Sequence, residues 1–224
     1  MIFSLLFFST NSYSKPEQLT LNQVEGVSGT QILKEAYQSL GINLTIKVQP
    51  ASRGLVSANN GSIDGEVNRI PGLNEKFGNL LMVDVPVFFV NIVPISARSD
   101  IKIESWDDLK KYKVGTMNGL KIAEKHLDPL MPYKKASNFE SLFSMLAKKR
   151  IDVAIAPYMD SLEHIKAKGH SFKVHDKSLD QIKLFHYLHK KHKDLLPDIT
   201  KSLKALEQNG RIQEYFESVA KSLK

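Results

Sequence analysis

The stretch LLMVDVPVFFVNIVPISAR, residues 80–98, decides the fold. Most of its residues are β-branched, aromatic or otherwise apolar, a composition that favours strands. Pro86 and Pro94 argue against a continuous helix, because proline lacks an N–H and clashes with the preceding turn. Within sheets, proline is confined largely to edge strands, strand starts and bulges. The stretch therefore predicts edge strands or a crossover between two lobes.

On the N-terminal side of this stretch, short strands and helices alternate. Segment 28–40 repeats apolar residues at three- and four-residue spacing, as an amphipathic helix does. We expect Ser28 or Thr30 to cap this helix and Gly41 to end it. The predicted elements are strands at 19–21, 43–48 and 63–67 and helices at 28–40 and 51–60. This order predicts parallel strands with helical crossovers.

A second α/β series follows on the C-terminal side. We expect Ser105 to cap a short helix, and a turn at 116–119 to connect a strand to the next helix. The predicted elements are helices at 105–109, 120–126, 139–149 and 161–168, strands around 114–116, at 151–156 and at 182–188, and two closing helices within 195–223 that are separated at Asn209–Gly210. Two α/β lobes joined by β-rich crossovers are the predicted architecture.

The composition excludes several classes of function. The 224 residues carry a net charge of +7 and no cysteine, which excludes disulfides, thiolate zinc sites, iron–sulfur clusters and cysteine nucleophiles. Charged residues make up 25%, the share expected of a globular protein rather than of a disordered one. Lysines and arginines are scattered, without a basic arm or an aromatic stacking platform, so we expect no nucleic-acid partner.

The first fourteen residues read as a secretory signal. Residues 2–8 are apolar, and Ser12-Tyr13-Ser14 offers a small-x-small cleavage site. No Lys or Arg precedes the apolar run, so the signal is atypical or the true start lies upstream. A hydrophobic first strand is the alternative. We predict cleavage after Ser14 and a periplasmic location.

The order of several short motifs resembles the type II periplasmic solute-binding proteins of family 3, the amino-acid-binding branch of transporter receptors. The motifs span most of residues 19–220 and are Leu40-Gly41, Gly61-Ser62-Ile63-Asp64-Gly65, Arg69-Ile70-Pro71, Ser105-Trp106-Asp107-Asp108-Leu109-Lys110, Lys113-Val114-Gly115 and Lys149-Arg150-Ile151-Asp152-Val153-Ala154. The resemblance implies an α/β, two-lobed fold in which each lobe is a mixed sheet flanked by helices. Lobe 1 would comprise 15–94 plus 185–224 and lobe 2 would comprise 95–184, with a two-strand hinge and the ligand bound between them.

Candidate ligand-binding residues of lobe 1 follow from strand ends and from the resemblance. Arg69 lies just after a predicted strand, where ligands bind in open α/β sheets, and its guanidinium fits a carboxylate. The family's carboxylate-binding arginine would align with Lys76. This leaves two interpretations of Arg69: it replaces that arginine, or it pairs with Glu66 or Glu75. Glu25 and Arg53 are further candidates, with an exposed loop and a helix cap as the alternatives.

In lobe 2 the resemblance points to Thr116 and Asn118, on the turn that leads into a helix, with plain capping as the alternative. Where amino-acid receptors carry an aspartate for the ligand ammonium, this chain has Pro157 and then Tyr158. Tyr158 is a candidate stacking residue or a structural one. Asp152 is expected to be structural.

No cofactor or metal is expected. The histidines of HYLHKKH, residues 186–192, are spaced by three, which puts neighbouring ligands on opposite faces of a strand. A solvated basic turn is the preferred interpretation of this segment.

The leading hypothesis is a non-enzymatic, monomeric binding protein that captures a small polar or anionic ligand, amino-acid-like or a carboxylate. An ABC permease or a membrane sensor would be its partner. One alternative is an enzyme resembling the cyclohexadienyl dehydratases, with Glu25 or Glu66 as the acid beside Arg69. The other is an interaction module that has lost its ligand.

Overall fold

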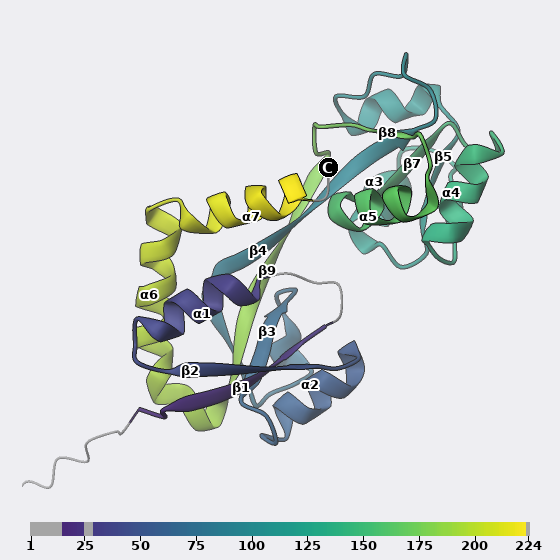
Figure 1. Ribbon diagram of the computed structural model, residues 1–224. Helices are drawn as coiled ribbons and strands as arrows, with labels where there is room; N and C mark the ends of the chain where they lie inside the picture. Colours follow the sequence, from purple (N-terminus) through teal and green to yellow (C-terminus); the bar gives the residue numbers. More distant parts are fainter. Residues whose placement is uncertain (1–14, 25–28, 223–224) are drawn as a thin grey trace, which may run out of the picture.

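The computed structural model describes residues 15–24 and 29–222, so the predicted signal segment and Glu25 lie outside the described residues. Figure 1 shows two lobes connected by the long strands β4 and β9. The elements of the first part of the chain are β1 (Gln18–Gln23), α1 (Thr30–Gln38), β2 (Asn43–Val48), α2 (Ala51–Asn59), β3 (Gly65–Arg69), the 3-10 turn η1 (Leu73–Glu75) and β4 (Leu80–Ser96).

The remaining elements return the chain to the first lobe. They are η2 (Trp106–Lys111), β5 (Val114–Met117), α3 (Lys121–Leu127), β6 (Lys134–Ala136), α4 (Phe139–Ala147), β7 (Val153–Pro157), α5 (Tyr158–Lys168), β8 (Lys173–Val174), β9 (Asp180–His189), η3 (Lys190–Leu195), α6 (Leu196–Gln208) and α7 (Arg211–Ser222).

The described strands form one continuous mixed sheet in the order β2-β1-β3-β9-β4-β7-β5-β6, with β8 paired to β4. In lobe 1, β1 is parallel to β2 and β3, whereas β9 is antiparallel to β3. In lobe 2, β5 is parallel to β6 and β7. The predicted fold class, α/β with a mixed sheet flanked by helices in each lobe, is therefore confirmed.

β4 and β9 form the crossover ribbon, which accommodates Pro86, whereas Pro94 lies in the stretch of β4 that pairs with β7. β4 pairs with β9 from Leu80 to Ile92 and with β7 from Ile92 to Ser96. Pro86 lies where the register with β9 shifts, the kind of irregularity that tolerates a missing N–H. β4 is thus the crossover that the sequence predicted, and it is internal to the sheet rather than an edge strand.

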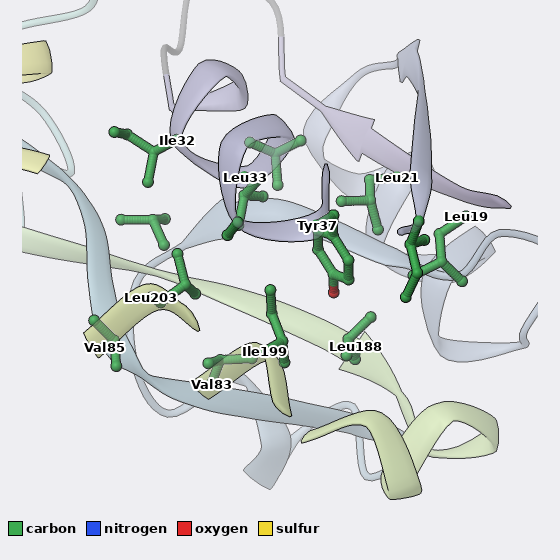
Figure 2. Packing of buried hydrophobic residues seen from close by; sticks show 14 of the residues in the cluster. Leu19, Leu21, Ile32, Leu33, Tyr37, Val83, Val85, Leu188, Ile199 and Leu203 are labelled. Carbon is green, nitrogen blue, oxygen red and sulfur yellow. The ribbon is translucent and has the colours of Figure 1, made fainter. Parts of the chain in front are cut away.

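The core of lobe 1 lies between the sheet and helices α1 and α6. Figure 2 shows Leu33 and Tyr37 of α1 facing Ile199 and Leu203 of α6 and the strands. Burying each such aliphatic side chain contributes about 1.5–3 kcal/mol. α7 is fixed to α1 by Arg211, whose guanidinium donates to both carboxylate oxygens of Glu35 at 2.9 and 2.8 Å.

Lobe 2 has its own buried clusters on the two faces of its sheet. Val93 and Ile95 of β4 pack with α4 and α5 on one face, and Ile92 of β4 packs with α3 on the other. Separate clusters in the two lobes leave the ribbon as the principal connection between them.

Most predicted elements are present with boundaries shifted by a few residues. Ser105 caps η2 as predicted, in a reciprocal capping box with Asp108. Thr30, predicted as a cap, instead donates its hydroxyl to Gln23, and Gly29 occupies the cap position. β6, β8, η1 and η3 were not predicted, because two- and three-residue strands and single turns carry too little periodicity to be read.

Candidate functional site

A hollow of about 330 Å³ lies at the carboxyl ends of β1 and β3. Ligands of open α/β sheets bind at such strand ends. We call it the Arg69 hollow. Its lining comes from the ends of β1 and β3, from α2, from η1 and from β9, and consists of Val24, Leu55, Asn68, Arg69, Ile70, Leu73 and Leu184.

Arg69 forms an ion pair with the buried Glu66 beneath the hollow. Its Nη2 lies 2.7 Å from Glu66 Oε2, and its Nε donates to the same oxygen at 2.9 Å. Nη2 also donates to the Ala51 carbonyl at 3.2 Å, which ties the first turn of α2 to the pair. The predicted pairing with Glu66, rather than with Glu75, is the geometry found here.

Glu66 belongs to a small polar network under α2. Its side chain is only 1% exposed, and Asn22 Nδ2 donates to Oε2 at 2.9 Å. Burial raises the pKa of Glu66, and the contacts with Asn22 and Arg69 oppose that rise. Within the described residues Glu66 Oε1 makes no hydrogen bond. The Arg69 charge is thus already compensated by a carboxylate that solvent does not reach.

Gly54 explains how α2 fits over this network. A Cβ at this position would lie 2.0 Å from Asn22 Nδ2 and 2.9 Å from Glu66 Oε1. Only glycine permits so close an approach of the helix backbone. A glycine inside a predicted helix is the sequence signal that could have located this network.

The crossover ribbon presents an apolar surface next to the Arg69 hollow. Leu184 pairs with Phe88 across β9 and β4, and the two residues form a buried cluster with Phe216. Val90 and Ile182, the next pair on the same face of the ribbon, pack against that cluster. The site is therefore mainly apolar, whereas the residues predicted for it from the sequence are charged or polar.

Tyr158 lies in a second hollow of about 340 Å³, between α7 and lobe 2. Asn91 and Val93 of β4 also line this Tyr158 hollow. They are separated from Phe88 by odd numbers of residues, so their side chains leave the opposite face of the strand. Phe216 of α7 packs between this hollow and the Phe88–Leu184 pair. Tyr158 and Arg69 line separate hollows and are not brought together.

The other predicted site residues are dispersed. Thr116 is fully buried, and its hydroxyl donates to the Ile155 carbonyl at 2.8 Å. Asn118 is exposed on its turn, with its backbone N–H donating to Ala136. Arg53 is exposed on α2. These ligand-binding roles, and that of Glu25, stay predictions, and of the described candidates Arg69 alone lines the Arg69 hollow.

Three histidines of the HYLHKKH segment have separate structural partners. His186 is fully buried, and its Nδ1 donates to the Glu66 carbonyl at 2.6 Å while Nε2 accepts from the Tyr37 hydroxyl at 2.8 Å. Burial lowers the pKa of His186 to about 4. His192 bonds to Asp64 at 2.7 Å, and His189 accepts from the Lys191 N–H. Among the described residues, no group of three His, Asp or Glu side chains could hold a metal ion.

Asp152 has the structural role that the sequence predicted. Its carboxylate accepts from the Lys113 backbone N–H at 2.9 Å, which fixes the loop before β7 to the loop before β5. Within the described part of the chain, no helix is long and apolar enough to cross a membrane.

Two α/β lobes, joined by two crossover strands and with a hollow at the strand ends, define the two-lobed type II periplasmic-binding-protein fold. Solved structures share this fold over nearly the whole chain. Substrate-binding domain 2 of Lactococcus lactis GlnP, in an open conformation, matches with a TM-score of 0.71 and 17% identity over 91% of this chain and 95% of that one. The unliganded, open L-cystine receptor of Neisseria gonorrhoeae matches with a TM-score of 0.67 and 14% identity over 89% and 92%.

The GluR0 ligand-binding core, solved with L-glutamate, matches with a TM-score of 0.66 and 14% identity over 91% of this chain and 98% of that one. In sequence, an uncharacterized protein of Shewanella oneidensis is 27% identical over 195 residues, which is 82% of this chain and 72% of that protein. No family model matches the chain. The resemblance that the sequence motifs indicated is thus confirmed in the fold.

Proposed function

We propose that this protein is a periplasmic solute-binding protein that captures a small amino-acid-like or carboxylate ligand between its lobes. Lobe 1 would comprise 15–94 plus 185–224, and lobe 2 would comprise 95–184. The protein would deliver its ligand to an ABC permease or report it to a membrane sensor. It would act as a monomer after removal of residues 1–14.

The observation that carries this proposal is the placement of the Arg69 hollow. It lies beside the crossover ribbon, at the carboxyl ends of β1 and β3, and its lining combines apolar side chains with Asn68 and Arg69. Ligand pockets commonly join an apolar wall to a few polar groups that fix orientation. Solved proteins of the same fold supply support, since their names specify L-glutamate, L-cystine and L-arginine.

The enzyme alternative finds less support. Of its two candidate acids, Glu25 lies outside the described residues. The other, Glu66, is only 1% exposed and already bonds to Asn22 and Arg69. A general acid must come within hydrogen-bond reach of its substrate. Glu66 would first have to leave its partners. We therefore infer a binding role rather than catalysis.

Thermal unfolding in the presence of ligands tests the proposal. The twenty amino acids and a set of small carboxylates, each at millimolar concentration, form the panel. A ligand at one hundred times its Kd stabilises the folded state by about 2.7 kcal/mol, which raises the Tm of a domain of this size by about 5–10 °C. The absence of any shift across the whole panel would overturn the proposal and favour the interaction-module alternative.

A further inference from the structure

The Arg69 hollow is unusually apolar for a site that would hold an amino acid or carboxylate. Five of its seven lining residues are aliphatic: Val24, Leu55, Ile70, Leu73 and Leu184. They come from the residue after β1, from α2, from the segment that joins β3 to η1, from η1 itself and from β9, so several elements contribute to the apolar lining. Any group seated there contacts hydrocarbon on several sides.

Part of this wall is exposed to solvent. Ile70 is 53% exposed, and among the described residues only Val48, Val56 and Ile70 are large exposed hydrophobics. Isolated apolar residues on a surface need no explanation. Ile70, however, stands at the rim of a concave site, where a ligand would cover it.

The charge of the hollow points in the same direction. Arg69 is its one charged residue, and the Glu66 carboxylate neutralises it at 2.7 Å. Nε and Nη2 are already engaged by Glu66 and Ala51. A compensated guanidinium can orient one polar group by hydrogen bonding, but it provides little net attraction for a second negative charge.

We infer that the Arg69 hollow receives an aliphatic or aromatic group of the ligand. The ligand would then be an amino acid or monocarboxylate with an apolar side chain, rather than one with a second charge. This inference rests on the proposed function and specifies its ligand class. A charged or amide side chain would lose its hydration on entering the hollow without gaining matched partners, whereas an aliphatic one gains from leaving water.

Matched ligand pairs test the inference by calorimetric titration of the full chain. L-Leucine and L-asparagine have the same backbone and similar side-chain size, as do L-methionine and L-glutamine. We expect the apolar member of each pair to bind at least tenfold more tightly. Equal or tighter binding of the polar members overturns this inference and leaves the proposed function standing. If no compound binds even at 10 mM, both are overturned.

A pair of variants at neighbouring surface positions tests whether the preference for apolar ligands arises in the Arg69 hollow. Ile70→Asn replaces a half-exposed side chain of the hollow, so we expect it to fold and to lower the affinity for the apolar ligand at least fivefold. Val56→Asn, on α2 beside Leu55, is the control, because Val56 is 58% exposed and does not line the hollow. Equal losses in the two variants, or no loss in Ile70→Asn, would place the apolar ligand elsewhere.

Discussion

Glu66 and Arg69 form the buried charge pair on which the site is built. Removing one partner of such a pair leaves an uncompensated charge, which typically costs about 3–5 kcal/mol. We expect Glu66→Gln to lower the free energy of unfolding at pH 7 by about 3 kcal/mol, since Arg69 is only 11% exposed. Urea denaturation measures this change.

Glu75→Gln is the matched control for this variant. Glu75 is exposed and was the other predicted partner of Arg69, so we expect its neutralisation to change stability by less than about 0.5 kcal/mol. A similar loss in both variants would mean that general charge balance, and not the buried pair, stabilises this edge of the sheet.

His186 makes the stability of lobe 1 depend on pH. The folded chain keeps this histidine neutral, because burial lowers its pKa from 6.5 to about 4. The unfolded chain takes up a proton at higher pH. The contribution of the neutral His186 to the free energy of unfolding is therefore complete above pH 6.5. It is lost as the pH falls to about 4, a change of about 3 kcal/mol.

Urea denaturation between pH 4 and pH 7.5, for the wild type and for His186→Gln, tests this prediction. The variant is expected to be less stable at pH 7.5 and to lose less stability on acidification. On acidification Glu66 changes the stability in the opposite direction to His186, and His175 and His189 change it in the same direction. The effect of His186 is therefore read from the difference in stability between the wild type and His186→Gln. His170→Gln, which removes a partly exposed histidine, should retain the wild-type slope. Parallel pH profiles for the wild type and His186→Gln would refute the assignment.

At the scale of single elements, α2 shows how tertiary contact overrides helix propensity. Replacing glycine by alanine inside a helix normally stabilises it by about 1 kcal/mol. At Gly54 the new methyl group would collide with Asn22 and Glu66. We expect Gly54→Ala to destabilise the protein by about 1–3 kcal/mol, as overpacking of a close contact does.

Thermal unfolding of Gly54→Ala beside Ser52→Ala distinguishes the two effects. Ser52 is exposed in the same helix, so its replacement by alanine should be neutral or slightly stabilising. A rise in Tm for Gly54→Ala would show that α2 can move away from the network without cost.

The elements were predictable where periodicity or capping was strong, and the site was less so. Segment 80–98 predicted the crossover, because its two prolines argue against a helix and its β-branched residues favour strands. The interpretation of Arg69 remained open between a ligand and Glu66, since a three-residue spacing does not reveal that a strand brings both side chains under α2. Leu55 and Leu184 are 129 positions apart, and only the sheet order places them around one hollow.

At the scale of the whole molecule, the two separate hollows allow movement of the lobes about the ribbon to be measured at two places. α2 and α3 pack on the face of the Arg69 hollow, since Leu55 of α2 lines it with Leu184 and α3 covers Ile92 and Ile182. α7 lies beside the second hollow, which Phe216 and Tyr158 line, and Phe216 also packs against Phe88 and Leu184 of the ribbon. We expect a rotation of the lobes about the ribbon that closes the Arg69 hollow to open the Tyr158 hollow.

Because the chain has no cysteine, paired labels can be introduced without background. We expect a ligand that binds in the Arg69 hollow to shorten the distance between labels at Val56→Cys and Lys125→Cys. The same ligand should lengthen the distance between Ser218→Cys and Lys177→Cys, on α7 and on the loop beside the Tyr158 hollow. Electron–electron double resonance of both pairs measures the two changes under the same conditions.

The control pair lies within lobe 1, at Val56→Cys and Lys204→Cys, and should keep its distance with and without ligand. Opposite signs in the first two pairs require rotation about β4 and β9, because compaction of the whole molecule would shorten both. If ligand binds with no change in either pair, the ribbon is rigid and recognition uses lobe 1 alone. A permease or sensor would then have no change of shape to detect, and transport or signalling through lobe closure would be excluded for this chain.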